Sequence, residues 1–217
     1  MSERHVLVCF AVKEEAAPFR KLLPSNLRVQ VLVTGMGATN SKNCVEAALA
    51  QSAPSLVLTC GLAGGLAPKL KLGEVVFDAE PNSDLYRALS GAGATPAKFH
   101  CAPTVATTPH QKSALRAETA ADAVEMESRC IRDICTSKKI ASATVRVVLD
   151  AADEELPLDF NQVMTPNQNL DPLKLAGFLA RNPGKIPALI RLQKQTHFAA
   201  TKLAEVLLRT LSTHGTQ

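Results

Sequence analysis

Short, almost wholly apolar runs punctuate the first two thirds of the chain. Runs of this kind are typical of strands that are buried on both faces of a sheet. They lie at Val6–Val12, Val29–Val33, Ser55–Thr59, Glu74–Asp78, Ala123–Met126 and Thr144–Leu149. Most of them end in a glycine-containing or polar segment, so we expect a strand at each run and a loop or helix after it.

Helices are predicted between the apolar runs, beginning at Lys13 and extending over Lys42–Gln51 and Glu127–Ser137. Asn40 and Ser41 supply the expected N-cap of the second helix. Residues 80–109 contain several Gly and Pro residues and predict loops with one short helix and one strand. The last quarter of the chain is predicted to be helical, with breaks at Pro157, Pro166, Pro172 and Pro183.

This alternation of strands and helices favours a largely parallel sheet with helices on both faces. We therefore expect one α/β domain over residues 1–217, an α/β/α sandwich around a mixed, largely parallel sheet, and a length of 217 residues suits one domain. Its C-terminal part is expected to be helical from about residue 162. Leu192, Ala199, Leu203 and Val206 fall on one helical stripe that should pack on the sheet.

Composition narrows the functional classes. Aromatic residues make up only 4% of the chain, which argues against the stacking platforms of single-stranded nucleic-acid binders. The formal net charge of +4 permits an anionic ligand without requiring one. The six cysteines form no CxxC pair or Cys/His ligand spacing, so we expect reduced thiols and no metal site. The polar N-terminus and the lack of a long apolar segment predict a cytoplasmic protein.

Candidate chemistry gathers where the predicted strands end, because ligands of such sheets bind at the carboxyl ends of the strands. Glu14 and Glu15 follow the first strand. Thr34, Gly35 and Gly37 follow the second, where small residues allow backbone N–H groups to approach an anion. An equally ordinary explanation is that these glycines permit a tight turn with positive φ.

Two acids flank Met126. On an extended segment Glu125 and Glu127 face the same way, and they are costly to bury unless something pairs with them. A ligand with vicinal hydroxyl groups would suit them. The alternative is that one of them caps the helix that follows.

Asp150 stands directly after a buried apolar strand. An acid in this position is a candidate for a raised pKa and for general-acid catalysis, although Asp is also a favoured helix N-cap. Arg146, four residues earlier, could neutralise a nearby carboxylate.

Several of these segments resemble, in order and spacing, the motifs of the nucleoside phosphorylase and nucleosidase superfamily, especially MTA/SAH nucleosidases. The matching segments are Ala11–Glu15, Thr34–Gly37, Cys60–Leu66, Leu72–Val76, Ala123–Ser128 and Val145–Asp153. Together they cover roughly residues 5 to 160. The stretch Asn182–Leu192 looks more like the hopanoid-associated phosphorylase branch, which acts on an adenosylated lipid.

The resemblance implies cleavage of a purine N-ribosyl bond through an oxocarbenium-like sugar, as in glycoside hydrolysis. Asp150 matches the acid that protonates the leaving base. Glu127 matches the carboxylate that binds the ribose hydroxyls, and Glu15 matches the base that activates water. The residues expected to line the substrate pocket are Gly61, Leu62, Ala63, Glu125, Met126 and Phe160. No metal or organic cofactor is implied.

The chain departs from the family pattern at three positions. Leu62 and Leu149 replace serines, and Thr59 stands near the position of a phosphate-binding arginine. These changes favour water over phosphate as the acceptor, so a purine nucleosidase is the leading hypothesis. Phosphorolysis of the hopanoid-associated type is the nearest alternative. A degenerate protein that binds a nucleoside without turnover is a third.

The expected partners follow from the same resemblance. They are a small purine nucleoside, phosphate in the phosphorolytic alternative, and further copies of the chain in a homo-oligomer. No nucleic acid is expected. The basic C-terminal helix could touch anionic lipid headgroups, although a solvated helix face is the more ordinary interpretation. Any ring that stacks on the base must come from Phe160, Tyr86 or Phe99.

Overall fold

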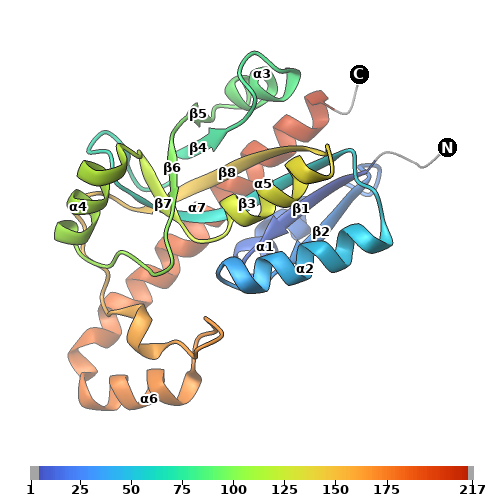
Figure 1. Ribbon diagram of the computed structural model, residues 1–217. Coiled ribbons are helices and arrows are strands. Elements are labelled where there is room, and N and C mark those ends of the chain that lie inside the picture. Colours follow the sequence, from blue (N-terminus) through green and yellow to red (C-terminus); the bar gives the residue numbers. More distant parts are fainter. Residues whose placement is uncertain (1–4, 215–217) are drawn as a thin grey trace.

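The computed structural model of the protein describes residues 5–214, and within them the fold is built around an eight-stranded mixed sheet (Figure 1). Its main path runs in the order β2 (Val29–Val33), β1 (Val6–Phe10), β3 (Leu56–Gly65), β8 (Ala141–Asp150), β4 (Val75–Asp78) and β5 (Thr95–Pro96). Off this path, β7 (Ala123–Glu125) pairs with the end of β3, and β6 (Phe99–Cys101) pairs with β7. Only the β4–β8 and β3–β7 pairs among those described are antiparallel, which confirms the predicted mixed, largely parallel sheet.

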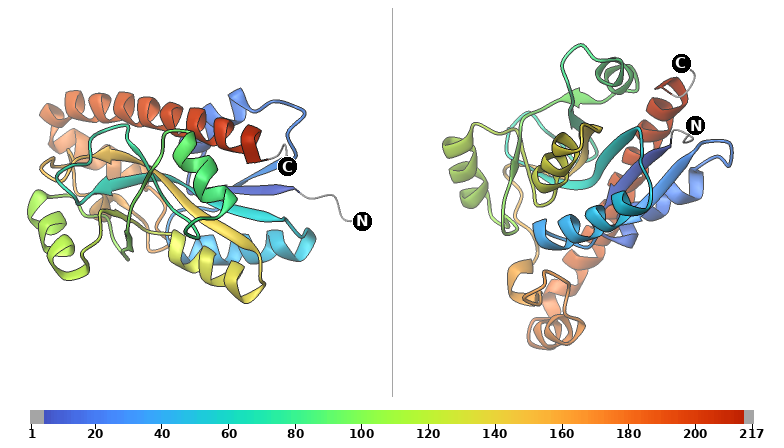
Figure 2. Two further views of the ribbon diagram at one scale, coloured as in Figure 1. Left: turned by 90° about the horizontal axis from the view of Figure 1, so that it is seen from above. Right: turned by 45° about the vertical axis from the view of Figure 1, so that its right-hand side comes forward.

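Helices cover both faces of the sheet. On one face lie α1 (Lys13–Leu22) and the long α7 (Ile186–His214), with α3 (Asp84–Gly91) beside α7. On the other lie α2 (Ala38–Gln51) and α5 (Ser128–Ser137), as the left view of Figure 2 shows. Each side has its own apolar cluster, one built from α1, α3, α7 and the sheet and the other from α2, α5 and the sheet.

The two central strands carry apolar side chains toward α7, and on the opposite face they carry polar as well as apolar ones. Val145 and Val147 of β8 belong to the cluster under α7. Arg146, between them, faces the other way because successive side chains of a strand alternate. There its guanidinium meets Thr59 of β3, and the backbone of Gly61 stands directly opposite Arg146 in the register.

The predicted N-cap of α2 was wrong by several residues. The helix begins at Ala38, and its N-cap is Gly37, whose positive φ of 80° suits glycine. Asn40 instead donates from Nδ2 to the carbonyls of Met36 and Asn167. Ser41 is buried against the Thr34 hydroxyl.

The middle of the chain contains more structure than the sequence pattern predicted. Two short strands, β5 and β6, replace the single strand expected, and the helix α4 (Pro109–Thr119) was not predicted at all. A signal for α4 was present. Thr108 and Gln111 form a capping box, and Pro109 occupies the first turn.

The last part of the chain leaves the body of the protein and returns. After the short η1 (Phe160–Val163), α6 (Pro172–Arg181) stands away from the sheet (Figure 1), and η2 (Pro183–Lys185) leads back into α7. Ala199, Leu203 and Val206 of α7 are buried in the core, as the stripe predicted. Leu192 is not part of that core and lines a cavity instead.

Candidate active site

A cavity of about 290 Å³ opens where the ends of β3, β7 and β8 meet. The sequence-predicted residues that line it are Glu15, Leu62, Ala63, Glu125, Met126, Glu127, Asp150 and Phe160. Residues far apart in the chain are thus brought to one place, at the carboxyl ends of strands, where ligands of such sheets bind. Gly61, Thr34, Gly35 and Gly37 do not line the cavity.

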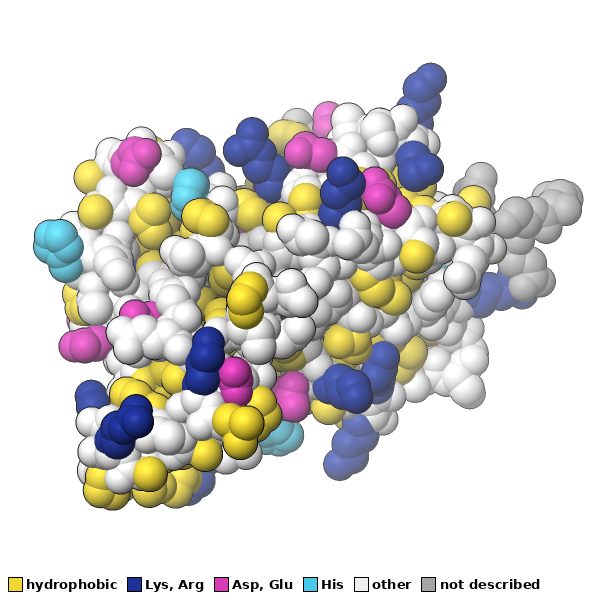
Figure 3. All heavy atoms as spheres, turned by 60° about the horizontal axis from the view of Figure 1, so that its bottom comes forward, with side chains coloured by type: hydrophobic (Ala, Val, Ile, Leu, Met, Phe, Trp, Pro, Cys, Tyr) yellow, Lys and Arg dark blue, Asp and Glu magenta, His cyan; other side chains and the backbone are white. Residues whose placement is uncertain are grey.

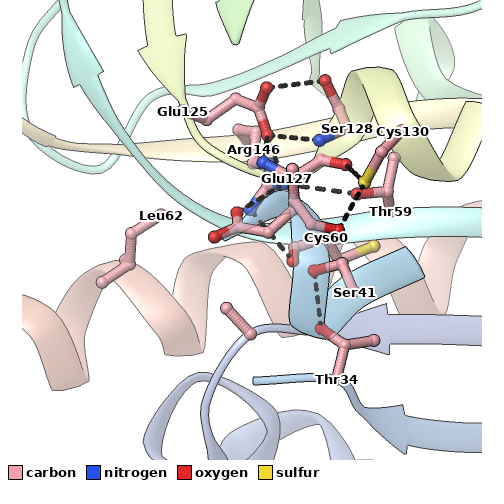
Figure 4. Close-up of polar contacts among 12 residues, drawn as sticks. Thr34, Ser41, Thr59, Cys60, Leu62, Glu125, Glu127, Ser128, Cys130 and Arg146 are labelled. Carbon is pink, nitrogen blue, oxygen red and sulfur yellow. Dashed lines mark hydrogen bonds and ion pairs between the residues drawn. The ribbon is translucent and has the colours of Figure 1, made fainter. Parts of the chain in front are cut away.

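One buried guanidinium organises the acids of this cavity (Figure 4). Arg146 is 1% exposed and donates from Nη2 to Glu125 Oε2 at 2.6 Å and to Glu127 Oε2 at 3.2 Å. It also donates from Nη2 to the Thr59 hydroxyl and from Nη1 to the Cys60 carbonyl. Arg146 therefore neutralises nearby carboxylates, as its position in the sequence suggested.

Glu125 is held entirely by the protein. Its Oε2 accepts the N–H groups of Glu127 and Ser128 and its Oε1 accepts the Ser128 hydroxyl, so it caps α5 as well as pairing with Arg146. Burial alone would raise its pKa, but Arg146 and these hydrogen bonds outweigh that effect and the pKa lies below its ordinary value. The capping alternative applies to Glu125, whose carboxylate supports the site.

Glu127 has a different set of partners. It is the N-cap residue of α5 but makes no side-chain cap, and its Oε1 accepts the N–H of Gly37 at 2.9 Å. Burial raises its pKa, and the neighbouring Glu125 adds to this rise while Arg146 opposes it. These two contacts fix the buried carboxylate at the cavity wall.

Glu15 is buried at the start of α1. Its Oε2 accepts the N–H groups of Ala11 and Val12, and its Oε1 accepts that of Leu62 at 3.1 Å. Burial raises its pKa to about 7, with Arg146 opposing and Glu127 adding to the shift. A Cβ at position 61 would lie 2.6 Å from Arg146 Nη1 and 2.9 Å from Glu15 Oε2, which is why glycine stands there.

Asp150 has a partner that the sequence analysis missed. Lys112, on α4, is 0% exposed and forms an ion pair with the Asp150 carboxylate. Its Nζ also donates to the carbonyls of Ala151 and Glu154, each at 2.7 Å. Burial raises the pKa of Asp150, while Lys112 limits the rise. The capping box of α4 is a sequence signal for the helix, but it does not indicate that this lysine is buried.

The glycine-containing loop after β2 has its N–H groups committed within the protein. Those of Thr34 and Gly35 donate to the carbonyls of Phe10 and Ala11, and that of Gly37 donates to Glu127. These three donors are therefore not free to hold an anion.

The rest of the cavity wall is mostly apolar. Leu62, Leu149 and Phe160 line it, together with Val12, Met36, Val105, Leu156, Met164 and Leu192. Phe160 is the ring placed to meet a ligand, because Tyr86 packs edge-on against Phe77 and Phe99 belongs to a separate cluster. Within residues 5–214 no group of His, Cys, Asp and Glu side chains is arranged to hold a metal ion.

Replacing Lys112 by methionine should leave the Asp150 carboxylate buried without a cation. We expect the free energy of unfolding to fall by about 3 kcal/mol near pH 8. The loss should be smaller near pH 5, because the unpaired carboxyl has a higher pKa in the folded state and is protonated there. Urea denaturation at both pH values measures this. The double variant Lys112→Met/Asp150→Asn should recover most of the loss, and an equal loss at both pH values would contradict the assignment.

The raised pKa of Glu15 predicts a pH-dependent stability. Between its ordinary value of 4.5 and about 7, the folded protein keeps a proton that the unfolded chain releases, so stability falls as pH rises through this window. From about pH 5 to about pH 8 the wild type should lose roughly 2 kcal/mol more than Glu15→Gln does. Denaturation curves test this. Glu14→Gln, an exposed neighbour on the same helix turn, should behave like the wild type.

Comparison with known proteins bears on the fold that holds this cavity. Residues 13–78 match the family described as the phosphorylase superfamily. A 5′-methylthioadenosine/S-adenosyl homocysteine nucleosidase from Helicobacter pylori has a similar structure, with a TM-score of 0.72 and 15% identity over 98% of this chain and 99% of that one. Futalosine hydrolase from the same organism gives a TM-score of 0.69 and 16% identity over 96% and 97%.

A third similar structure is the MTA/SAH nucleosidase of Colwellia psychrerythraea, which was solved in complex with adenine. Its TM-score is 0.71, with 17% identity over 97% of this chain and 95% of that one. The family match over residues 13–78 and the fold shared over nearly the whole chain confirm the resemblance to the phosphorylase superfamily, whose nucleoside phosphorylase-like α/β fold this protein has.

Proposed function

We propose that this protein cleaves the N-ribosyl bond of an adenosine-type purine nucleoside by hydrolysis and releases the free base. The observation that carries the proposal is the convergence of four buried acids on one cavity, of which Glu125 is held by Arg146 and the start of α5 and the other three are left for chemistry. Glu15 comes from α1, Glu127 from the start of α5 and Asp150 from the end of β8. Acid, electrostatic and base roles can be divided among three such groups because their surroundings differ.

Asp150 is the proposed acid. A purine anion is a poor leaving group, so transfer of a proton to N7 of the base makes its departure easier. Burial, which raises the pKa of Asp150, favours the protonated carboxyl that this step needs. Lys112 fixes the orientation of the carboxyl through the ion pair.

Glu127 is the proposed ligand of the ribose. Its carboxylate is anchored by Arg146 and by the N–H of Gly37, while its place in the cavity wall leaves it able to accept the ribose hydroxyls. As the bond to the base breaks, positive charge develops on the sugar, and a carboxylate held in place stabilises it without reorganising.

Glu15 is the proposed base that removes a proton from the attacking water. Its pKa of about 7 is close to the value at which a base combines ionisation at neutral pH with strength as a proton acceptor. Met126 and Phe160 would then line the space for the nucleoside, with Leu62 and Ala63 on the β3 side.

Water rather than phosphate is the acceptor that these surroundings favour. The N–H groups of Thr34, Gly35 and Gly37 are already used, and Arg146 is enclosed by carboxylates that would repel an anion. The similar structures described above are also nucleosidases or a hydrolase by name.

The choice of acceptor is tested by following base release from adenosine-type nucleosides with and without added phosphate. We expect release to proceed in phosphate-free buffer and to yield the free sugar. Strict dependence on phosphate, with the sugar recovered as its 1-phosphate, would establish phosphorolysis instead. Binding of adenine without turnover of any purine nucleoside would contradict the proposal and favour a degenerate protein that only binds nucleosides.

The acid role is tested by Asp150→Asn, which keeps the shape of the side chain but removes its proton donor. We expect kcat to fall by about 100-fold or more, with adenine binding retained in a direct titration. Asp153→Asn, an exposed change three residues along the same loop, is the matched control and should retain full activity. A full rate in Asp150→Asn would remove Asp150 from the mechanism.

A further inference from the structure

The segment that stands away from the body of the protein exposes apolar side chains. We call residues Leu170–Ile190, which span α6, η2 and the first turn of α7, the α6 hairpin. None of the residues of α6 is buried. Leu173 is 85% exposed, and Leu170, Ile186 and Ile190 are between 42% and 50% exposed. Four large exposed aliphatic side chains on one protruding segment indicate an interaction surface.

The two sides of α6 differ. Leu175, Phe178 and Leu179 are half-buried, whereas Leu173 and Ala176 are exposed on the outer side. The exposed side is therefore apolar along its length, with cations at its two ends, Lys174 and Arg181. This is the arrangement of a helix that lies in an interface, and Figure 3 shows hydrophobic side chains beside Lys and Arg side chains on this part of the molecule.

The charge of the hairpin and of the following part of α7 is mainly positive, although Asp171 is the N-cap of α6 and Lys202 pairs with Glu205. Between residues 172 and 204 the sequence has six Lys and Arg residues and no Asp or Glu. The cations are Lys174, Arg181, Lys185, Arg191, Lys194 and Lys202. Such a surface is complementary to an anionic one, and two copies of it facing each other would repel.

We propose that the α6 hairpin is a membrane-docking surface, whose cations bind anionic lipid headgroups while Leu173 and Ile190 enter the interfacial layer. A lipid surface fits both the positive charge and the exposed apolar side chains of the hairpin, because it offers negative charge and an apolar layer at the same boundary. A second copy of the chain would cover the apolar side chains but would not complement the positive charge. Among residues 5–214 no helix is long and apolar enough to cross a membrane.

Docking would also place the cavity beside the lipid. Leu192 and Thr196, on α7 directly after the hairpin, form part of the cavity wall. Phe160 and Met164, which precede the hairpin, form another part. The docking surface does not depend on the chemistry proposed for the cavity, and its test is one of binding.

The experiment is flotation of the whole protein with phosphatidylcholine vesicles, with and without phosphatidylglycerol, at low and high salt. The wild type should float with the anionic vesicles at low salt and separate from them at high salt. Little should float with phosphatidylcholine alone. Absence of flotation under every condition would overturn the proposal.

Two variants and two matched controls assign the binding to the hairpin. Arg181→Gln/Lys185→Gln should reduce the partition onto anionic vesicles by at least about tenfold, and Leu173→Gln should also reduce it while keeping the charge. Because these side chains are exposed, the fold should be kept, and base release from a soluble nucleoside should match that of the wild type. The controls Lys138→Gln/Lys139→Gln and Leu22→Gln change exposed residues before β8 and at the end of α1.

Equal partition of the hairpin variants and the controls would overturn the proposal. So would self-association of the wild type that Leu173→Gln abolishes, in the absence of vesicle binding, because the surface would then be an interface between copies. Loss of vesicle binding with base release unchanged supports docking alone. Failure of base release in the wild type bears only on the proposed chemistry.

Discussion

Burial of the Arg146 guanidinium is the constraint on which the arrangement of the cavity depends. A cation taken out of water is costly unless oxygens replace its hydration shell. Here the oxygens come from β3, from the last residue of β7 and from the turn before α5. The sheet, the N-terminus of α5 and the start of α2 are thereby linked, since Glu127 bridges Arg146 and the N–H of Gly37.

Arg146 lowers the pKa of three carboxyl groups, those of Glu125, Glu127 and Glu15, but their other surroundings differ. Glu125 takes the short contact and the hydrogen bonds of the α5 N-terminus, so it remains ionised. The pKa values of Glu127 and Glu15 are both raised. Around one arginine, a structural carboxylate with a lowered pKa is therefore distinguished from two carboxyl groups with raised pKa values, and local hydrogen bonding decides which is which.

The sequence predicted the sheet well because buried strands are read from unbroken apolar runs, and the ends of those runs led to Glu15, Glu127 and Asp150. It was less successful where structure depends on side-chain contacts between distant segments. The start of α2 was misplaced, because Asn40 contacts Asn167 instead of capping the helix. Lys112 was missed, because an exposed helix such as α4 carries no apolar run and nothing in a local pattern indicates that one of its lysines is buried.

The contacts of Lys112 also divide the cavity into a rigid wall and an adaptable one. Two of its three acceptors are backbone carbonyls of the loop after β8. Movement of that loop would therefore leave a buried ammonium group without hydrogen-bond acceptors. Another part of the wall comes from Phe160 and Met164 and from Leu192 and Thr196 of α7, side chains that are only partly buried. Ligands of different shapes should therefore be accommodated on the side of η1 and α7, and inhibitors should be anchored at Asp150 and varied in size at the other end.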